Sequence, residues 1–383
     1  MTRSLIFLRL VRVLNNNHFL NISLLILTLL VALSRLLFQG EVFTFDYGIF
    51  QPDGSNYTFR TLVFMGIEEK SAAKQVSDWY LTHGINHNVI DYRSLLPENS
   101  PVWHLSAPRV LYPLLSVPFV YVFGIPGMLC VPILSLVMTV LILLNIGISV
   151  DKKFQSVLFI LLLLCSTTLS RWMIANLTDS LLVLISTLFL LLIVKEKNIS
   201  SRIWNISATL LVLCGSLTRF SFPLWFSLGC FVFFFVGKGK SLSVLVTSIL
   251  GAVPLFFFSP ASGITNSASE GSFANRIFLF FIQALKVIFF EIAQLFVLDR
   301  ILLGILVLSL IAAILTRRSA SSMLLFTVFL SSLVTGSLNG VVGVNFRYYL
   351  PVVPFMIYFL VLTDWLKIYG SLNIKIRKSQ KEL

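Results

Sequence analysis

The segment of residues 45–60, which follows the first long apolar run, contains the residues best suited to chemistry. Pro52 and Gly54 flank Asp53 and predict a turn at residues 52–55, after which residues 57–65 can begin a helix along an apolar surface. A carboxylate held partly out of water there would have a raised pKa and could accept a proton as a general base. Asp53 is therefore the candidate base. The alternative is an ordinary turn or cap aspartate, the more frequent role of Asp in Pro-Asp-Gly.

Two later segments combine charged and aromatic side chains beside apolar runs. Arg171 and Asp179 lie within residues 170–182, and Arg347 and Tyr348 lie within residues 346–354. Arg219 stands at the end of another run. Guanidinium groups form paired hydrogen bonds with phosphate oxygens, and cations stabilise a departing phosphate. These arginines could therefore bind an anionic group; the competing interpretation is that they only extend toward lipid headgroups.

The elements that position these residues are predicted to be membrane helices. Of the 383 residues, 57% are hydrophobic and 12% are charged, and the mean hydropathy is +0.92. Soluble domains have roughly a quarter of their residues charged, and about 20 apolar residues cross a bilayer as a helix. The sequence predicts an all-α, polytopic transmembrane protein that forms a single membrane domain over residues 1–383. Its ten apolar runs are residues 20–38, 126–148, 156–174, 179–194, 203–218, 222–236, 241–258, 301–316, 322–340 and 349–366.

The basic residues predict the orientation of these spans. The formal net charge of +13 could indicate binding to nucleic acid, but more than half of the 29 Lys and Arg residues lie in the two tails and in four short links between apolar runs. Short basic links are typical of the cytoplasmic side of a membrane. We therefore expect both termini in the cytoplasm and no nucleic-acid partner.

Two polar segments are then expected on the outer side. Residues 39–109 would form a large outer loop with surface helices, and residues 259–300 a second outer segment with an interfacial helix. The stretch 111–123 would be a helix about 20 Å long, short of the roughly 30 Å hydrocarbon core, so we expect a half-span or re-entrant piece. The stretch 277–298 contains Lys286 and Glu291 and fits a helix lying in the interface. If it crossed, the next basic link would lie outside.

The three charged segments resemble those of the GT-C superfamily of membrane glycosyltransferases, which includes the protein O-mannosyltransferases and the aminoarabinose transferase of lipid A. In that superfamily an aspartate follows the first span, a tyrosine lies one helical turn later and a glycine closes the surface helix. Asp53, Tyr57 and Gly66 match this pattern, and residues 170–182 and 346–354 resemble its later segments. More acidic members carry a second carboxylate beside the first, where this chain has Gly54. The metal requirement therefore stays open.

The resemblance implies a function and a role for each residue. A sugar would pass with inversion from a polyprenyl-phosphate donor to a glycan, lipid or protein acceptor, at the outer face of a bacterial plasma membrane. Asp53 would be the catalytic base, Asp179 an assisting carboxylate and Arg347 a phosphate-binding residue. A divalent cation could serve as cofactor. Supporting contacts to the substrate would come from Arg171, Tyr57, Arg219 and Tyr348.

Two other functions compete with this interpretation. The first is a transporter or flippase of lipid-linked glycans, and the second is a catalytically silent relative that acts as a membrane partner. Transporters place ionisable residues in mid-membrane, whereas nearly every charge in this chain lies at the end of an apolar run or in a loop. That distribution disfavours a transporter and leaves the silent relative open.

Overall fold

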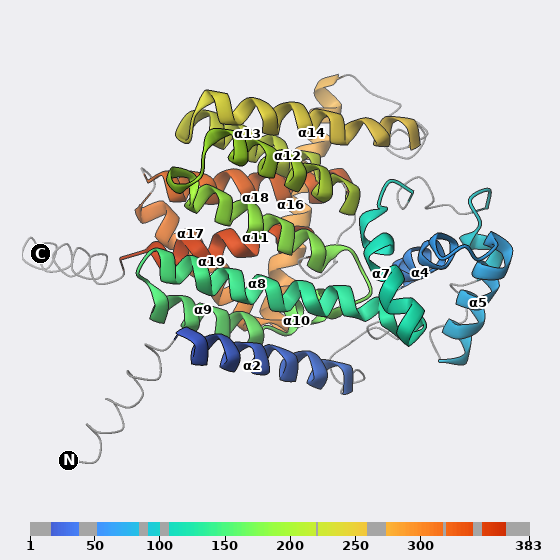
Figure 1. The fold of residues 1–383 in the computed structure, drawn as a ribbon. Helices are drawn as coiled ribbons and strands as arrows, with labels where there is room; N and C mark the ends of the chain where they lie inside the picture. Colours follow the sequence, from blue (N-terminus) through green and yellow to red (C-terminus); the bar gives the residue numbers. More distant parts are fainter. Residues whose placement is uncertain are drawn as a thin grey trace, which may run out of the picture.

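The structure, a computed structural model, describes residues 17–37, 52–83, 91–99, 107–219, 221–258, 273–316, 319–339 and 347–364. Every element in these ranges is a helix, which confirms the all-α prediction. Figure 1 shows a stack of long helices that run side by side, with α4, α5 and α7 gathered at one end of the stack. The candidate site lies where the two parts meet.

The helices of the stack overlap the predicted apolar runs. Helix α11 contacts α8, α12 and α19 and so lies inside the stack. Its Phe189 packs against Trp204 of α12 and Trp225 of α13, with ring centroids 6.3 and 5.7 Å apart. Large apolar side chains such as Ile22 of α2 and Leu330 of α18 are exposed, which is typical of a surface that contacts lipid or a partner. The stack comprises α2 (Asn17–Leu37), α8 (Cys130–Ser149), α9 (Lys153–Cys165), α11 (Asp179–Val194), α12 (Ser201–Thr218), α13 (Phe222–Phe235), α14 (Lys238–Phe258), α17 (Arg300–Leu315), α18 (Ala320–Asn339) and α19 (Val353–Leu362).

Few of these helices are long enough to cross a membrane by themselves. Among the described residues, one helix, Ile125–Ser149, is long and apolar enough to do so. There is a second candidate span if α9 and α10 (Thr167–Ile174) together form one bent span. The predicted run 156–174 is thus not a single helix, because the axis turns by 76° between α9 and α10. The number of ten spans stays a prediction.

A buried aspartate explains where this bend lies. One oxygen of Asp299 accepts hydrogen bonds from the Ser166 hydroxyl (2.6 Å) and from the backbone N–H of Thr168 (2.8 Å), at the start of α10. The other oxygen accepts from the backbone N–H of Leu302 (2.9 Å), at the start of α17. A side-chain acceptor at a helix start replaces a missing backbone partner. Because one carboxylate caps two helices, α10 has to begin beside the start of α17.

The predicted outer loop contains α4 (Pro52–Phe64), α5 (Glu69–Thr82) and the short helix η1 (Tyr92–Leu95). The predicted turn at residues 52–55 is wrong, since α4 already begins at Pro52. Proline suits the first position of a helix, where its missing N–H costs no hydrogen bond. Gly66 follows α4 with a φ of 87°, a conformation that favours glycine.

Two further segments of the predicted topology form helices. Helix α7 (Leu111–Phe123) has 13 residues, is followed by Gly124 with a φ of 66° and packs on α4. That it does not cross the membrane stays a prediction. Helix α16 (Phe273–Leu298) includes the stretch 277–298 and contacts α17 and α18. Its Glu291 is buried, whereas Phe289 and Phe296 are exposed. The interfacial placement of α16 stays a prediction, and residues 259–272 lie outside the described ranges.

Candidate functional site

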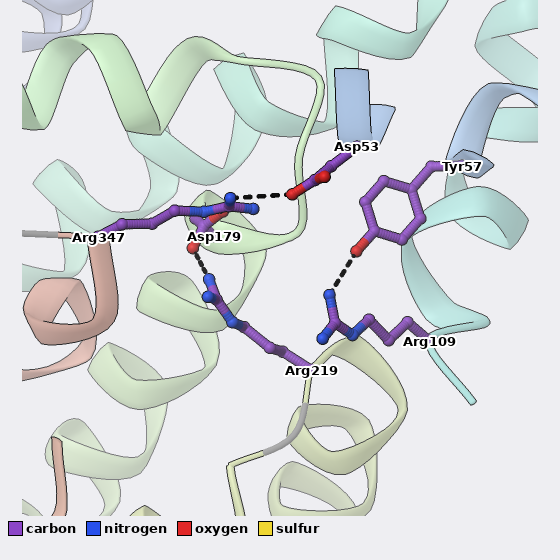
Figure 2. A network of polar contacts seen from close by, with 6 residues as sticks. All are labelled: Asp53, Tyr57, Arg109, Asp179, Arg219 and Arg347. Carbon is purple, nitrogen blue, oxygen red and sulfur yellow. Dashed lines mark hydrogen bonds and ion pairs between the residues drawn. The ribbon is translucent and has the colours of Figure 1, made fainter. Parts of the chain in front are cut away.

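Four charged side chains from distant parts of the chain meet at the end of the stack beside α4 (Figure 2). Nη1 of Arg347 lies 3.0 Å from Oδ2 of Asp53, and its Nε lies 3.0 Å from Oδ2 of Asp179. The other oxygen of Asp179 pairs with Nη1 of Arg219. These four residues form one continuous set of ion pairs, here named the ion-pair network. All four were predicted as site residues from the sequence.

Helix ends place these side chains. Asp53 and Asp179 lie in the first turns of α4 and α11, where free backbone N–H groups and the positive end of the helix dipole favour a carboxylate. Arg219 directly follows α12, where the negative end of the dipole favours a cation. Arg347 begins the short helix η4 (Arg347–Val352). The dipoles thus favour three of the four charges, whereas Arg347, at the positive end of η4, depends on its two carboxylate partners.

The two carboxylates differ in their access to solvent. The Asp179 side chain is 1% exposed, and both of its oxygens are held by arginines. The Asp53 side chain is 58% exposed, and the ion pair with Arg347 uses Oδ2. Asp53 is thus the carboxylate that a ligand from solvent can reach, whereas Asp179 contacts only Arg219 and Arg347 within the ion-pair network.

The pKa of Asp53 is lowered. Desolvation by itself raises it, but the charge and hydrogen bond of Arg347 and the nearby charges of Arg109 and Arg219 outweigh this effect. The prediction of a raised pKa is therefore wrong, because it did not include the cations around the carboxylate. Asp53 is ionised at neutral pH and can accept a proton, although as a weaker base than a carboxylate without these neighbours.

The start of α4 packs directly on the segment that leads into α11. A Cβ added to Gly54 would lie 2.1 Å from Nδ2 of Asn176, so position 54 has no room for a side chain. Asn176 is fully buried, and its Nδ2 donates a hydrogen bond to the Tyr80 hydroxyl at 2.7 Å. This contact fixes Asp53 relative to Asp179. It also explains why no second carboxylate can follow Asp53.

Tyr57 does not belong to the ion-pair network. Its hydroxyl accepts a hydrogen bond from Nη1 of Arg109 at 2.8 Å, and its ring packs edge-on against Tyr112 with centroids 5.6 Å apart. Arg109 was not among the predicted site residues. Arg109 lies next to the apolar stretch that begins at Leu111, as Arg219 lies next to the stretch that ends at Thr218. This position beside an apolar stretch could have identified Arg109 as a candidate from the sequence.

Aromatic rings cover the guanidinium groups of the site. Arg347 and Arg171 lie 5.1 and 4.9 Å from the ring centroid of Trp172, and Arg219 lies 4.7 Å from that of Tyr348. Such contacts stabilise a cation that has left water. Arg171 and Arg219 are buried. Burial beside aromatic rings disagrees with the interpretation that these arginines only extend to lipid headgroups.

A small depression, open to solvent, lies against the ion-pair network. Arg219, Arg347 and Tyr348 form one part of its lining. The remaining walls combine apolar side chains, including Leu182 and Leu224, with hydroxyl groups, including Ser332 and Thr335.

The network is poorly suited to hold a metal ion. Its carboxylate oxygens face guanidinium groups, whose positive charge disfavours a second cation at the same place. In the described part of the chain, no group of three or more His, Cys, Asp or Glu side chains is arranged to bind a metal. The divalent cation suggested by the resemblance therefore has no set of ligands among the residues of Figure 2.

Comparison with known proteins identifies no relative. No family model, no curated protein and no solved structure matches the chain. The function is therefore argued from the geometry of the site and from its charged segments.

Proposed function

We propose that the chain is a membrane glycosyltransferase of the GT-C type, which transfers a sugar from a polyprenyl-phosphate donor to an acceptor at the outer face of the membrane. The observation that supports this most is the meeting of Asp53, Asp179 and Arg347. Arg347 is 294 residues from Asp53 and 168 from Asp179 in sequence. Each residue was selected from a separate short motif, and residues selected by chance at such separations have no reason to share one network.

In the proposed reaction, Asp53 takes the proton of the acceptor hydroxyl while the hydroxyl oxygen attacks the anomeric carbon of the sugar. The bond from this carbon to the phosphate oxygen breaks, and its electron pair leaves with polyprenyl phosphate. Attack from the face opposite the phosphate inverts the anomeric configuration. The proton then resides on Asp53, and guanidinium groups stabilise the new negative charge on the phosphate.

The proposal includes ten spans in the plasma membrane, with both termini in the cytoplasm and Asp53 outside. The pairing of Glu196 with Lys240 supports this orientation, because it joins two of the basic links at the end of α11 opposite Asp179. Helices of 13–16 residues are short for a span, at roughly 20–24 Å. Local thinning of the bilayer accommodates such a mismatch at modest cost.

The test uses the purified full chain in detergent, with a polyprenyl-phosphate sugar and a panel of glycan, lipid and peptide acceptors. Asp53→Asn keeps the shape and removes the base, so transfer should fall at least about a hundredfold. Asp46→Asn is the matched control from the same predicted loop and should be much milder. If Asp46→Asn abolishes transfer and Asp53→Asn leaves it near wild type, the assignment of the base is wrong.

Other functions would give different results. Movement of a labelled lipid-linked sugar across vesicles, without transfer to any acceptor, would identify a flippase. Activity with a soluble nucleotide sugar and none with the lipid-linked form would contradict the proposed donor.

A further inference from the structure

The groups around Asp53 carry more positive than negative charge. Three guanidiniums, those of Arg109, Arg219 and Arg347, lie near two carboxylates, those of Asp53 and Asp179 (Figure 2). Three positive charges less two negative ones leave a formal charge of +1. A partly enclosed excess of positive charge attracts an anion.

Arg109 is the source of this excess. Arg219 and Arg347 are paired with carboxylates. Across the described ranges, by contrast, no carboxylate oxygen lies within the 4.0 Å of an ion pair from Arg109, whose hydrogen bond goes to the neutral Tyr57 hydroxyl. Figure 2 shows Arg109 extending beneath Tyr57 toward Arg219. Its Nε and Nη2 donors remain available to a ligand.

One face of α4 holds Arg109 in this position. Asp53, Tyr57 and Arg60 are spaced four and three residues apart and so lie on the same face of the helix. Tyr57 accepts from Arg109, and Nη1 of Arg60 donates to the carbonyl oxygen of Ala107 at 2.6 Å. These two contacts fix the chain just before α7. A guanidinium that is already fixed loses little conformational freedom when it binds a ligand.

We propose that Arg109, aligned by Tyr57, binds the phosphate group of the substrate, and that Arg347 is a positioning residue that holds the two carboxylates. The ligand class is a phosphate ester with an apolar chain, so this inference rests on the proposed function. Because the Tyr57 oxygen accepts from Arg109, its own O–H can donate to a phosphate oxygen. Phosphate binding is thereby assigned to Arg109 in place of Arg347, the residue expected from the sequence.

The experiment measures binding of a short isoprenyl phosphate, and separately of inorganic phosphate, to the full chain in detergent. Arg109→Gln should weaken isoprenyl-phosphate binding by about ten- to a hundredfold, the range for losing a charged hydrogen bond. Arg109→Lys should recover part of this loss, and Tyr57→Phe should cause a smaller one. The exposed Arg93 provides the matched control, since Arg93→Gln should bind as wild type does.

Arg347→Gln separates the two roles. As a positioning change, it should slow sugar transfer while altering isoprenyl-phosphate affinity by less than about threefold, a shift smaller than the loss of one hydrogen bond. If Arg347→Gln has a lowered thermal midpoint, Arg347→Lys, which keeps the positive charge, provides a second variant for the same comparison. Loss of binding in both Arg347 variants, with wild-type affinity in Arg109→Gln, would overturn the inference and leave the proposed function intact. Binding of inorganic phosphate alone, lost in Arg109→Gln, would support the anion site and contradict the lipid donor. A wild-type chain that binds neither probe would overturn both.

Discussion

Replacing Gly54 by alanine tests the contact that fixes Asp53 relative to Asp179. The new Cβ would meet the Asn176 amide group at 2.1–2.3 Å, so one of the two segments has to move. Asn176 is fully buried and hydrogen-bonded to Tyr80, and it cannot turn aside without breaking that bond. The substitution therefore acts on packing and on a buried hydrogen bond together.

The expected magnitude follows from these effects. Overpacking costs about 1–3 kcal/mol, and breaking a buried hydrogen bond costs about 1–3 kcal/mol more. Alanine gains about 0.5–1 kcal/mol over glycine within a helix. The free energy of unfolding should fall by about 1–5 kcal/mol, with sugar transfer reduced because Asp53 moves with Gly54.

The assay compares thermal midpoints in detergent at one scan rate, since large proteins often unfold irreversibly. Gly304→Ala in α17 is the matched control, because a Cβ there meets nothing within 4 Å, and it should not lower the midpoint. The double variant Gly54→Ala/Asn176→Ala should be less destabilised than the sum of its single variants, since the shorter side chain makes room. If Gly54→Ala melts as wild type does, or if the two substitutions are additive, the contact between α4 and the segment before α11 is not as described.

Three further predictions address charge, capping and topology. The pKa of Asp53 is lowered from its ordinary value of 3.8, so its ionised form contributes stability above about pH 4 that is lost as the pH falls through the lowered pKa. The thermal midpoint of the wild-type protein should therefore exceed that of Asp53→Asn by a constant amount near neutral pH, and the two midpoints should converge in acid. A difference between the midpoints that grows on acidification would contradict this prediction. Asp299→Ala should lower the free energy of unfolding by roughly 2–4 kcal/mol, because it removes a buried cap from two helices. The control Asp78→Ala, on the exposed surface of α5, should have little effect. Equal thermal midpoints for the two variants would refute the capping role of Asp299. Reporter fusions that are active only outside the cytoplasm should be active after residue 80 and inactive after residues 152, 197, 239 and 317, and an inactive fusion at 80 would remove Asp53 from the outer face.

The sequence was informative where local rules apply. Apolar runs predicted most helices of the stack, and charged residues at the ends of runs predicted Asp53, Asp179, Arg219 and Arg347. For Asp53, Asp179 and Arg219, the helix dipole favours the charge found at that terminus. Their meeting could not be derived from spacing along the chain, since it depends on how the helices pack. The resemblance of the three segments suggested that they belong together.

Interactions between distant segments account for what the sequence did not predict. The break between α9 and α10 depends on Asp299, which lies more than 130 residues after Ser166, so the run 156–174 resembled a single helix. The pKa of Asp53 depends on arginines from other helices. Arg109 acquires its place through Tyr57, and no local pattern marks that contact.

The ion-pair network also has a consequence for biosynthesis. Asp179 is followed by Arg219 after 40 residues and by Arg347 after 168 residues. At roughly 5–20 residues per second, the first arginine emerges about 2–8 s after the aspartate and the second about 8–34 s after it. A lone carboxylate is costly to bury, so we expect the N-terminus of α11 to stay at the water interface until Arg219 arrives. Asp53 waits still longer for its partner, and a chain that ends before residue 347 has both acidic segments but lacks the guanidinium that pairs with both carboxylates.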